Sequence, residues 1–364
     1  MGGPNRPTGD FHSHSHLVVD LHRINGINRR FFFPPFSSFF FGMGEAGAFP
    51  NTAAVISKWF PSQETSRGVS IACCGIYAGG AAAPFFVVPI ADDYGWRAPF
   101  LINGLIGILW VLVCIFWFRN NPSEMKRIPN EEKTFIESNR RYSRHSQKYP
   151  WKKVLRNRSL FALVLAHSAA SCANAFFLLW LPPYLKSARN FSKNEVLMTY
   201  TIAWSLATIA CFFSGHLSDW LIKTKGIRFG RRSVGFTVLA VCGLSILAQT
   251  FISNHSTIII AIIIGVIFLS PINVSSFGTC VDLGGNRAGT VSGIMNFCAQ
   301  VTSFLFVTVF GNLIDVTHGF SLPVYILASV LLSCSFIWFL VDPSKPLFVD
   351  EELKSVLVEP ALNV

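Results

Sequence analysis

Long runs without a charged residue are the feature that most constrains this chain. Residues 100–118, 233–252 and 256–280 each approach or exceed the roughly 20 residues that a helix needs to cross a hydrocarbon core of about 30 Å. Only 13% of the 364 residues are charged, against about 25% in a soluble chain. Inside a bilayer a helix satisfies its own backbone hydrogen bonds. The sequence therefore predicts an all-α polytopic membrane protein.

Apolar stretches of this kind recur along the chain and predict about nine transmembrane helices. Two of them, 38–58 and 68–91, are rich in Gly, Ala and Ser, which favours close packing inside a helical bundle. Stretches rich in Phe and Ile are expected to face lipid more. The nine predicted spans are 38–58, 68–91, 97–118, 159–181, 196–222, 234–253, 256–279, 289–313 and 320–341.

The net charge of +11 lies mainly in the loops, so it favours membrane orientation over nucleic-acid binding. Residues 119–158 form the one long polar segment and hold twelve Lys or Arg and four Glu. If this segment is a cytoplasmic loop, the basic loop 223–233 and the C-terminus are cytoplasmic too. A bacterial inner membrane is the expected location. Segment 119–158 is expected to be a solvated connector rather than a patch on anionic headgroups.

The nine cysteines are scattered and form no CxxC pair, so neither a disulfide framework nor a metal site is predicted. His12, His14 and His16 are interpreted as part of a polar tail. No pairing of nucleophile and base suggests catalysis. We therefore expect no enzyme activity, no catalytic residues and no cofactor.

The loop between the fifth and sixth spans carries a motif. Residues 215–219 read Gly-His-Leu-Ser-Asp, and residues 228–232 read Arg-Phe-Gly-Arg-Arg, which ends in Arg231 and Arg232. This resembles the Gly-x-Leu-x-Asp and Gly-Arg-Arg loop of the major facilitator superfamily. The resemblance implies that Asp219, Arg231 and Arg232 form a gate loop that latches one state and opens when the bundles rock. The alternative is a generic basic loop.

A second group of motifs is similar to the anion:cation symporter branch of that superfamily, which includes hexuronate, glucarate and galactonate transporters, sialin and vesicular glutamate transporters. The similarity covers about residues 40–341 and rests on segments 42–68, 74–80, 94–104, 121–124, 180–185 and 293–297.

This similarity implies that the nine spans correspond to family helices four to twelve, so helices one to three are expected to be lacking. The expected organisation is an atypical N-terminal segment, a partial N-terminal bundle, a basic cytoplasmic loop, a C-terminal six-helix bundle and a cytoplasmic tail. Their expected ranges are 1–37, 38–119, 120–158, 159–341 and 342–364.

Four residues are candidates for substrate binding and proton coupling. A carboxylate inside hydrocarbon is costly, and the resemblance implies that Glu45 couples proton movement to anion binding; the alternative is a glutamate at the interface. Asn296 is a polar amide within an apolar span, where it would contact substrate or bond another helix. Tyr77 would offer a hydroxyl or simply pack. Asn174 lies on one helix face with His167, seven residues away.

Together these features predict a secondary transporter of a small organic anion, such as the sugar acids hexuronate or glucarate, working by alternating access with H⁺ symport. The expected partners are the anion, the coupling proton and the lipid bilayer, with no nucleic acid, and the protein is expected to be a monomer. Segment 168–171 lacks the arginine that some vesicular relatives carry in this helix, which argues against a glutamate-type site. The alternative function is a remnant that inserts but carries nothing.

Overall fold

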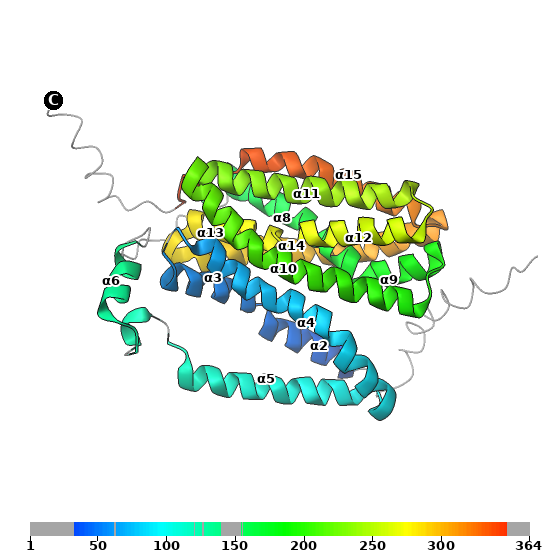
Figure 1. The fold of residues 1–364 in the computed structure, drawn as a ribbon, viewed down its shortest axis with the longest axis horizontal. Coiled ribbons are helices and arrows are strands. Elements are labelled where there is room, and N and C mark those ends of the chain that lie inside the picture. The colour runs from blue at the N-terminus through cyan, green and yellow to red at the C-terminus, as the bar shows by residue number, and fades with distance from the viewer. Residues whose placement is uncertain are drawn as a thin grey trace, which may run out of the picture. The chain divides into compact units, whose positions relative to one another are not determined.

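The computed structural model of the chain describes residues 33–61, 63–119, 121–125, 127–139, 154 and 156–347, with only the backbone of 33–38 and 286. These residues form helices and their connections, and the described ranges contain no strand. The chain divides between Ala48 and Phe49 into two units. The smaller one contributes α2 (Phe33–Glu45), and the larger one holds all helices from α3 (Ala48–Trp59) onward apart from its first residue (Figure 1).

Eight helices in the described part are long and apolar enough to cross a membrane, which confirms the prediction of an all-α polytopic membrane protein. Several crossings combine consecutive helical segments. The eight crossings are α4 (Thr65–Tyr94), α5 (Arg97–Trp117), α8 with its continuation (Arg158–Ala188), α10 (Lys193–Lys225), α11 (Ile227–Phe251), α12 with α13 (His255–Gly284), α14 (Ala288–Thr317) and α15 with its last turn (Ser321–Leu340).

The sequence predicts about nine spans, and the difference lies at 38–58. There the chain forms two helices, α2 and α3, of 13 and 12 residues, rather than one crossing. Pro50 explains the break: it lies in the first turn of α3 and has no N–H to bond the carbonyl of Ala46, so a continuous helix through this point is disfavoured. Hydropathy reports that the stretch is apolar, but it does not report where a helix within the stretch is interrupted.

Two crossings depart from regular α-helix. The crossing His255–Gly284 consists of α12 (His255–Leu269) and α13 (Ile272–Gly284), separated by a turn at Ser270 and Pro271. The crossing Arg158–Ala188 begins as α8 (Arg158–Ala175) and continues through the wider turns Phe176–Trp180 and Tyr184–Ala188 around the short α9 (Leu181–Pro183). Such local irregularities expose backbone groups that a regular helix would bond internally.

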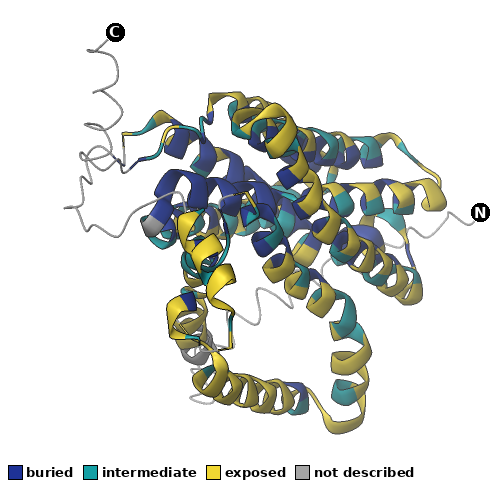
Figure 2. Ribbon diagram, turned by 60° about the vertical axis from the view of Figure 1, so that its left-hand side comes forward, coloured by how far each residue is buried: buried dark blue, intermediate teal, exposed yellow. Residues whose placement is uncertain are grey.

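The core of the larger unit lies among the later crossings. Along α8, Leu163, Ala166, Ala170 and Ala173 are fully buried, and Figure 2 shows buried residues concentrated in these helices. Trp338, just beyond α15, is fully buried against Gly235 of α11. Because lipid tails are as apolar as the side chains, such packing rests on close van der Waals contact.

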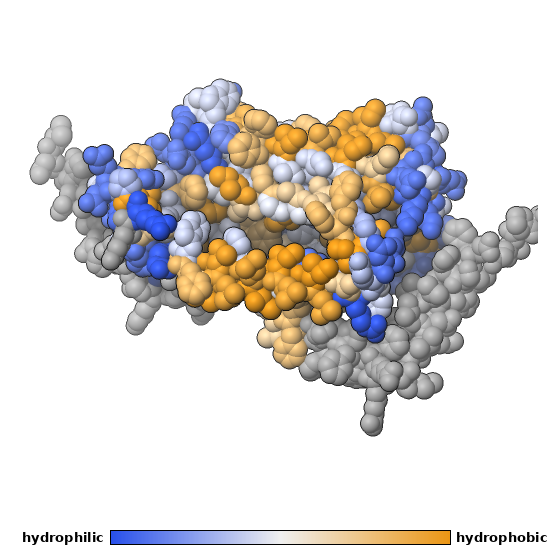
Figure 3. Space-filling view, turned by 60° about the horizontal axis from the view of Figure 1, so that its bottom comes forward, coloured by the Kyte–Doolittle hydropathy of each residue, from blue (hydrophilic) through white to orange (hydrophobic). Residues whose placement is uncertain are grey.

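The helices α4 and α5 are less enclosed. The α4 helix packs along α10, whereas α5 packs against α4 and exposes most of its apolar side chains. These side chains form a hydrophobic band with hydrophilic residues at its ends (Figure 3). Apolar side chains exposed in this way are suited to contact with lipid tails.

Candidate functional site

Asp219, near the end of α10, caps the beginning of α4. Its carboxylate accepts the backbone N–H of Ser66 at 3.2 Å and that of Arg67 at 3.1 Å. The first N–H groups of a helix have no partner within the helix, and an acidic side chain there also complements the helix dipole. The residue preceding α4, Glu64, makes no such side-chain bond. Asp219 therefore supplies from another helix the cap that α4 lacks.

Beside this cap, Arg231 of α11 is fully buried and joins three elements. Its Nε donates to Asp282 Oδ2 of α13 at 2.8 Å, and its Nη1 donates to Ser66 Oγ at 2.7 Å and to Ser218 Oγ at 3.3 Å. Asp219 and Asp282 are 1% and 2% exposed. The Arg231 and Asp282 charges are thus withdrawn from water and paired with each other, while Arg231 Nη2 is buried without a hydrogen-bond partner among the described residues.

Glycine at position 278 makes room for this arginine. A Cβ placed on Gly278 would lie 2.6 Å from Arg231 Cζ, well inside van der Waals contact. The hydroxyl of Ser275, one turn earlier on α13, donates to the Arg231 carbonyl at 3.0 Å. The α13 helix therefore fits both the side chain and the backbone of Arg231.

Further contacts join α4 and α10 along their length, and the two helices run antiparallel. The thiol of Cys211 donates to the Ser70 carbonyl at 3.8 Å, and that of Cys74 to the Thr208 carbonyl at 3.5 Å. A Cβ at Gly215 would lie 2.7 Å from Ser70 Cβ. We call the contact from Ser66 and Asp219 to Cys74 and Thr208 the α4–α10 seam.

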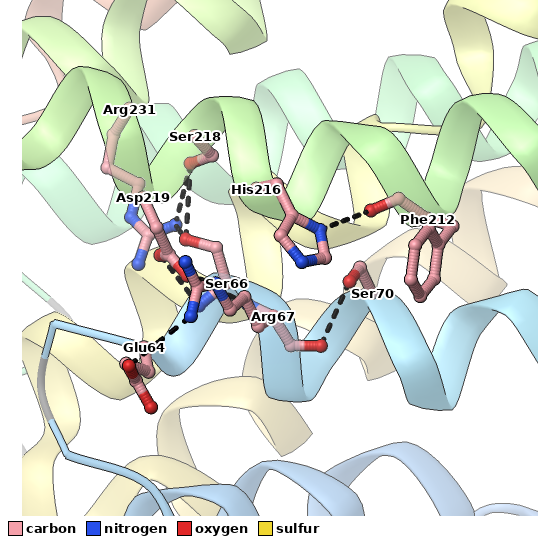
Figure 4. Close-up of polar contacts among 9 residues, drawn as sticks. All are labelled: Glu64, Ser66, Arg67, Ser70, Phe212, His216, Ser218, Asp219 and Arg231. Atoms are coloured by element: carbon pink, nitrogen blue, oxygen red, sulfur yellow. Dashed lines mark hydrogen bonds and ion pairs between the residues drawn. The ribbon is translucent and has the colours of Figure 1, made fainter.

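Figure 4 shows the charged end of this seam. The Arg67 side chain lies between two carboxylates, with Nη1 3.3 Å from Glu64 Oε1 and Nε 3.8 Å from Asp219 Oδ2. The Ser70 hydroxyl turns back to the Arg67 carbonyl at 2.9 Å. His216 points to its own helix, where Nδ1 lies 3.3 Å from the Phe212 carbonyl, so it takes no part in the cluster.

Tyr77 connects α4 to the turn between α12 and α13. Its hydroxyl donates to the Ser270 carbonyl at 3.2 Å and accepts from Asn273 Nδ2 at 3.3 Å. Its ring centroid lies 5.7 Å from that of Trp204 on α10. Tyr77 is 3% exposed, so in this conformation its hydroxyl is occupied by protein groups.

The other predicted binding residues take no part in the hydrogen bonds of the seam described above. Asn174 on α8 and Asn296 on α14 are both half-buried, and no hydrogen bond joins either of them to Tyr77. His167 is buried, with its ring edge-on to Phe277 at 5.6 Å between centroids. Glu45 is the exposed last residue of α2, in the smaller unit. The structure thus brings Asp219 and Arg231 together in one buried cluster.

Arg232 does not join the seam. Its Nε donates to the Val341 carbonyl at 2.6 Å, in the segment after α15. Neighbouring residues on a helix point about 100° apart, so Arg231 and Arg232 cannot share one partner. Residues 341–347, which we call the C-terminal strap, also bond Ser159 through the Asp342 N–H at 3.0 Å and Leu283 through the Leu347 N–H at 2.9 Å.

Three contributors were missed by reasoning from sequence: Ser66, Asp282 and Asn273. Asp282 does carry a signal in the sequence: it is an isolated acidic residue at the end of the uncharged run 256–280, on the same predicted side of the membrane as Asp219. Ser66 and Asn273 carry no such signal, because their partners lie 153 and 196 residues away in the chain. Within the described ranges, no group of three or more His, Cys, Asp or Glu is arranged to hold a metal.

The fold and the seam define an integral, multi-pass helical membrane protein whose crossings meet at a buried cluster of charges. The sequence model of the Major Facilitator Superfamily matches residues 34–307. The chain belongs to this family, which confirms the predicted resemblance; the family comprises transporters, not enzymes.

Comparison with individual proteins agrees with this assignment. The chain is 29% identical over 296 residues to a probable sulfoacetate transporter, SauU, of Cupriavidus necator, covering 80% of this chain and 68% of that protein. It is 25% identical over 285 residues to a hexuronate transporter of Bacillus subtilis, covering 77% and 66%. The chain thus spans about two thirds of the length of these relatives.

Among solved structures, the proton:xylose symporter XylE is similar in fold, with a TM-score of 0.59 and 14% identity. The match covers 84% of this chain and 70% of that structure. At this level of identity the likeness concerns the arrangement of helices alone.

Proposed function

We propose that the chain is a secondary transporter that moves a small organic anion across the membrane by alternating access. The class of substrate is supported by the relatives, which carry the names of a sulfoacetate and a hexuronate transporter. Both names denote small acids that are fully ionised at neutral pH. A sugar acid such as hexuronate or glucarate is the substrate that we propose.

The observation that carries the proposal is the α4–α10 seam. At its charged end, the hydrogen bonds join side chains to helix-end N–H groups and hydroxyls, and water can take the place of these partners when the two helices separate. Asp219 and Arg231 are buried only while α4, α10 and α13 stay together. Such a seam is suited to a gate that is stable when closed and has an alternative, hydrated state when open.

In the middle of the described crossings, an anion would meet uncharged hydrogen-bond donors rather than Lys or Arg. In the described crossings, Lys and Arg lie near the helix ends, as Arg67, Arg97 and Arg231 illustrate. We assign substrate contacts to Tyr77, Asn174 and Asn296. Tyr77 would exchange its bond to Asn273 for one to a substrate carboxylate or hydroxyl, because a phenol can donate to either.

We assign proton coupling to Glu45. The test is uptake of labelled galacturonate and sulfoacetate into proteoliposomes that contain the full chain, with and without an inward proton gradient. Wild-type protein should accumulate one of the acids when the gradient is imposed, and Glu45→Gln should abolish the effect of the gradient. The matched control is Glu131→Gln, on the exposed surface of α6 (Asn130–Ser138). Gradient-driven accumulation by Glu45→Gln equal to wild type would exclude this role.

The orientation and setting complete the proposal. The end of the bundle that holds Lys223, Lys225 and Arg228 is assigned to the cytoplasm by the positive-inside rule, so the C-terminal strap is cytoplasmic too. The membrane is taken to be a bacterial inner membrane, and the working unit a monomer. A reporter fused after residue 364 and assayed on either side of the membrane tests the orientation.

A second candidate function has one observation in its favour. None of the most apolar part of α5 is buried by other helices of the described chain, whereas a complete bundle encloses a central site from both halves. A protein that inserts without transporting would have this feature. It would fold and embed normally, yet give the same uptake as empty liposomes with either acid.

A further inference from the structure

The ends of α5 mark the two surfaces of the membrane. With 21 residues, this helix is about 32 Å long, which matches the thickness of the hydrocarbon core. The helix begins at Arg97, directly after Trp96, and ends at Trp117, two residues before Arg119. The Arg97 guanidinium carbon lies 4.3 Å from the centre of the Trp96 ring. Tryptophan and arginine together are typical of the headgroup level, so Arg119 lies at that level.

Lipids can reach this end of α5 from the membrane. Phe116 and Trp117 are 77% and 62% exposed, and Figure 2 shows α5 exposed along most of its length. The hydrophobic band in Figure 3 runs to the hydrophilic residues at the helix end. An acyl chain lying along this band would lead directly to Arg119.

A cavity of about 330 Å³ opens at this point. Its wall combines aromatic side chains from the helix with charged side chains from the segment that follows. The lining residues are Phe116, Trp117, Arg119, Glu124, Met125 and Arg127. The cavity is therefore apolar where α5 ends and cationic where the chain leaves the membrane.

The charges of the cavity are unbalanced. Within the described part of the chain, neither Arg119 nor Arg127 lies within ion-pair distance of a carboxylate; Arg119 Nη1 donates only to the adjacent Phe118 carbonyl, at 2.7 Å. The one acid of the lining, Glu124, accepts a bond from Asn121 Nδ2 at 2.6 Å. Two guanidinium groups thus face one carboxylate that already has a partner.

We infer that this cavity binds the phosphate of an anionic phospholipid. Guanidinium groups bind phosphate oxygens in pairs of parallel hydrogen bonds, and Arg119 and Arg127 are free to do so. Phe116 and Trp117 take up the first part of the acyl chains. Each arginine favours an anionic over a zwitterionic headgroup by roughly fivefold. This site is independent of the transport proposed above.

The test uses the purified full chain in detergent with short-chain phosphatidylglycerol and phosphatidylcholine as probes, and binding is followed by native mass spectrometry. Phosphatidylglycerol should bind at least about tenfold more tightly than phosphatidylcholine. The variant Arg119→Gln/Arg127→Gln should lose this preference, and Glu124→Gln should strengthen it because the competing carboxylate is gone. Equal binding of the two lipids by wild-type protein would overturn the inference.

Two controls distinguish a lipid site from a general effect of charge and from a site for soluble phosphate. The variant Lys133→Gln/Arg156→Gln removes the same number of charges outside the cavity, at the half-buried Lys133 and the exposed Arg156. This variant should retain the preference for phosphatidylglycerol, and an equal loss of preference would mean that only the overall charge of the protein matters. Glycerol 3-phosphate distinguishes a soluble phosphate from a lipid. It should not displace phosphatidylglycerol at equal concentration, and displacement would contradict a lipid site. Melting curves in phosphatidylcholine alone should agree for all variants, which shows that each is folded.

Discussion

The carboxylate of Asp219 accepts the backbone N–H of Arg67 at 3.1 Å, across 152 residues of sequence. Together with the bond from the Ser66 N–H to the same carboxylate, this bond makes the first turn of α4 depend on the last turns of α10. A helix end that is capped by another helix loses its cap when the two move apart. The α4–α10 seam therefore ties a local feature of secondary structure to the relative position of two crossings.

Removing this cap should loosen the seam. We expect Asp219→Ala to cost about 0.5–2 kcal/mol, which shifts the closed–open balance roughly twofold to thirtyfold toward separation. In a variant that keeps Cys211 as its only cysteine, a membrane-permeant maleimide should then react correspondingly faster, because the Cys211 thiol is buried against Ser70. Asp315→Ala, at an exposed position on α14, is the control and should leave the rate unchanged.

Filling the space at Gly278 should displace Arg231. We expect Gly278→Ala to destabilise the protein by about 1–3 kcal/mol, the usual cost of overpacking, because the new methyl group would collide with the guanidinium. Thermal unfolding in detergent measures the effect. Gly107→Ala makes the same change on α5, where no atom lies within 4 Å of the new carbon. Equal melting temperatures for the two variants would contradict the packing that we describe.

The pair formed by Arg231 and Asp282 should respond differently to single and double replacement. We expect Asp282→Asn to cost about 3–5 kcal/mol, because it leaves a buried guanidinium without its counter-ion. Arg231→Met/Asp282→Leu replaces both charges by apolar groups and should recover most of that loss. Denaturant unfolding of the three proteins measures the difference. If the double variant is less stable than Asp282→Asn, the cost of the single replacement cannot be explained by an unpaired Arg231 charge, and the expectation is wrong.

The C-terminal strap should weaken in acid. Partial burial alone would raise the pKa of Asp342, but bonds from Ser344 and the Arg228 guanidinium outweigh it and hold this pKa below its ordinary value of 3.8. The stabilisation is therefore complete above about pH 5 and is lost as the pH falls through the lowered pKa. Arg228 is 55% exposed, so solvent limits the contribution to about 0.5 kcal/mol. Asp342→Asn should be less stable than wild type at pH 6, and the difference should shrink as the pH is lowered below 3.8.

Much of the fold could be predicted because the bilayer imposes one strong rule. Uncharged runs such as 100–118 and 233–252 have no other stable form in lipid than a helix. The stretch 38–58 is helical too, but it contains Glu45 and divides into α2 and α3, with Pro50 in the first turn of α3. Hydropathy measures the solvent that a segment prefers, whereas a helix break depends on one backbone N–H.

The candidate site was predictable only where its signal is local. Asp219 and Arg231 lie 12 residues apart around one tight turn, so a motif can contain both. Arg232 was grouped with them because it is adjacent in sequence, yet the helical period turns it toward Val341. Ser66 joins Arg231 across 165 residues, a relationship that depends on how the helices pack and that no pattern in one sequence contains.

Whether the seam is a gate can be decided by measuring transport while α4 and α10 are cross-linked. The hydroxyl oxygens of Ser66 and Ser218 lie 3.2 Å apart, so Ser66→Cys/Ser218→Cys in a background without other cysteines should form a disulfide on mild oxidation. We predict that the reduced protein takes up galacturonate or sulfoacetate into proteoliposomes, that oxidation stops uptake and that dithiothreitol restores it, while each single-cysteine variant is unaffected. Undiminished uptake by fully cross-linked protein, or none by the reduced protein, would contradict the account.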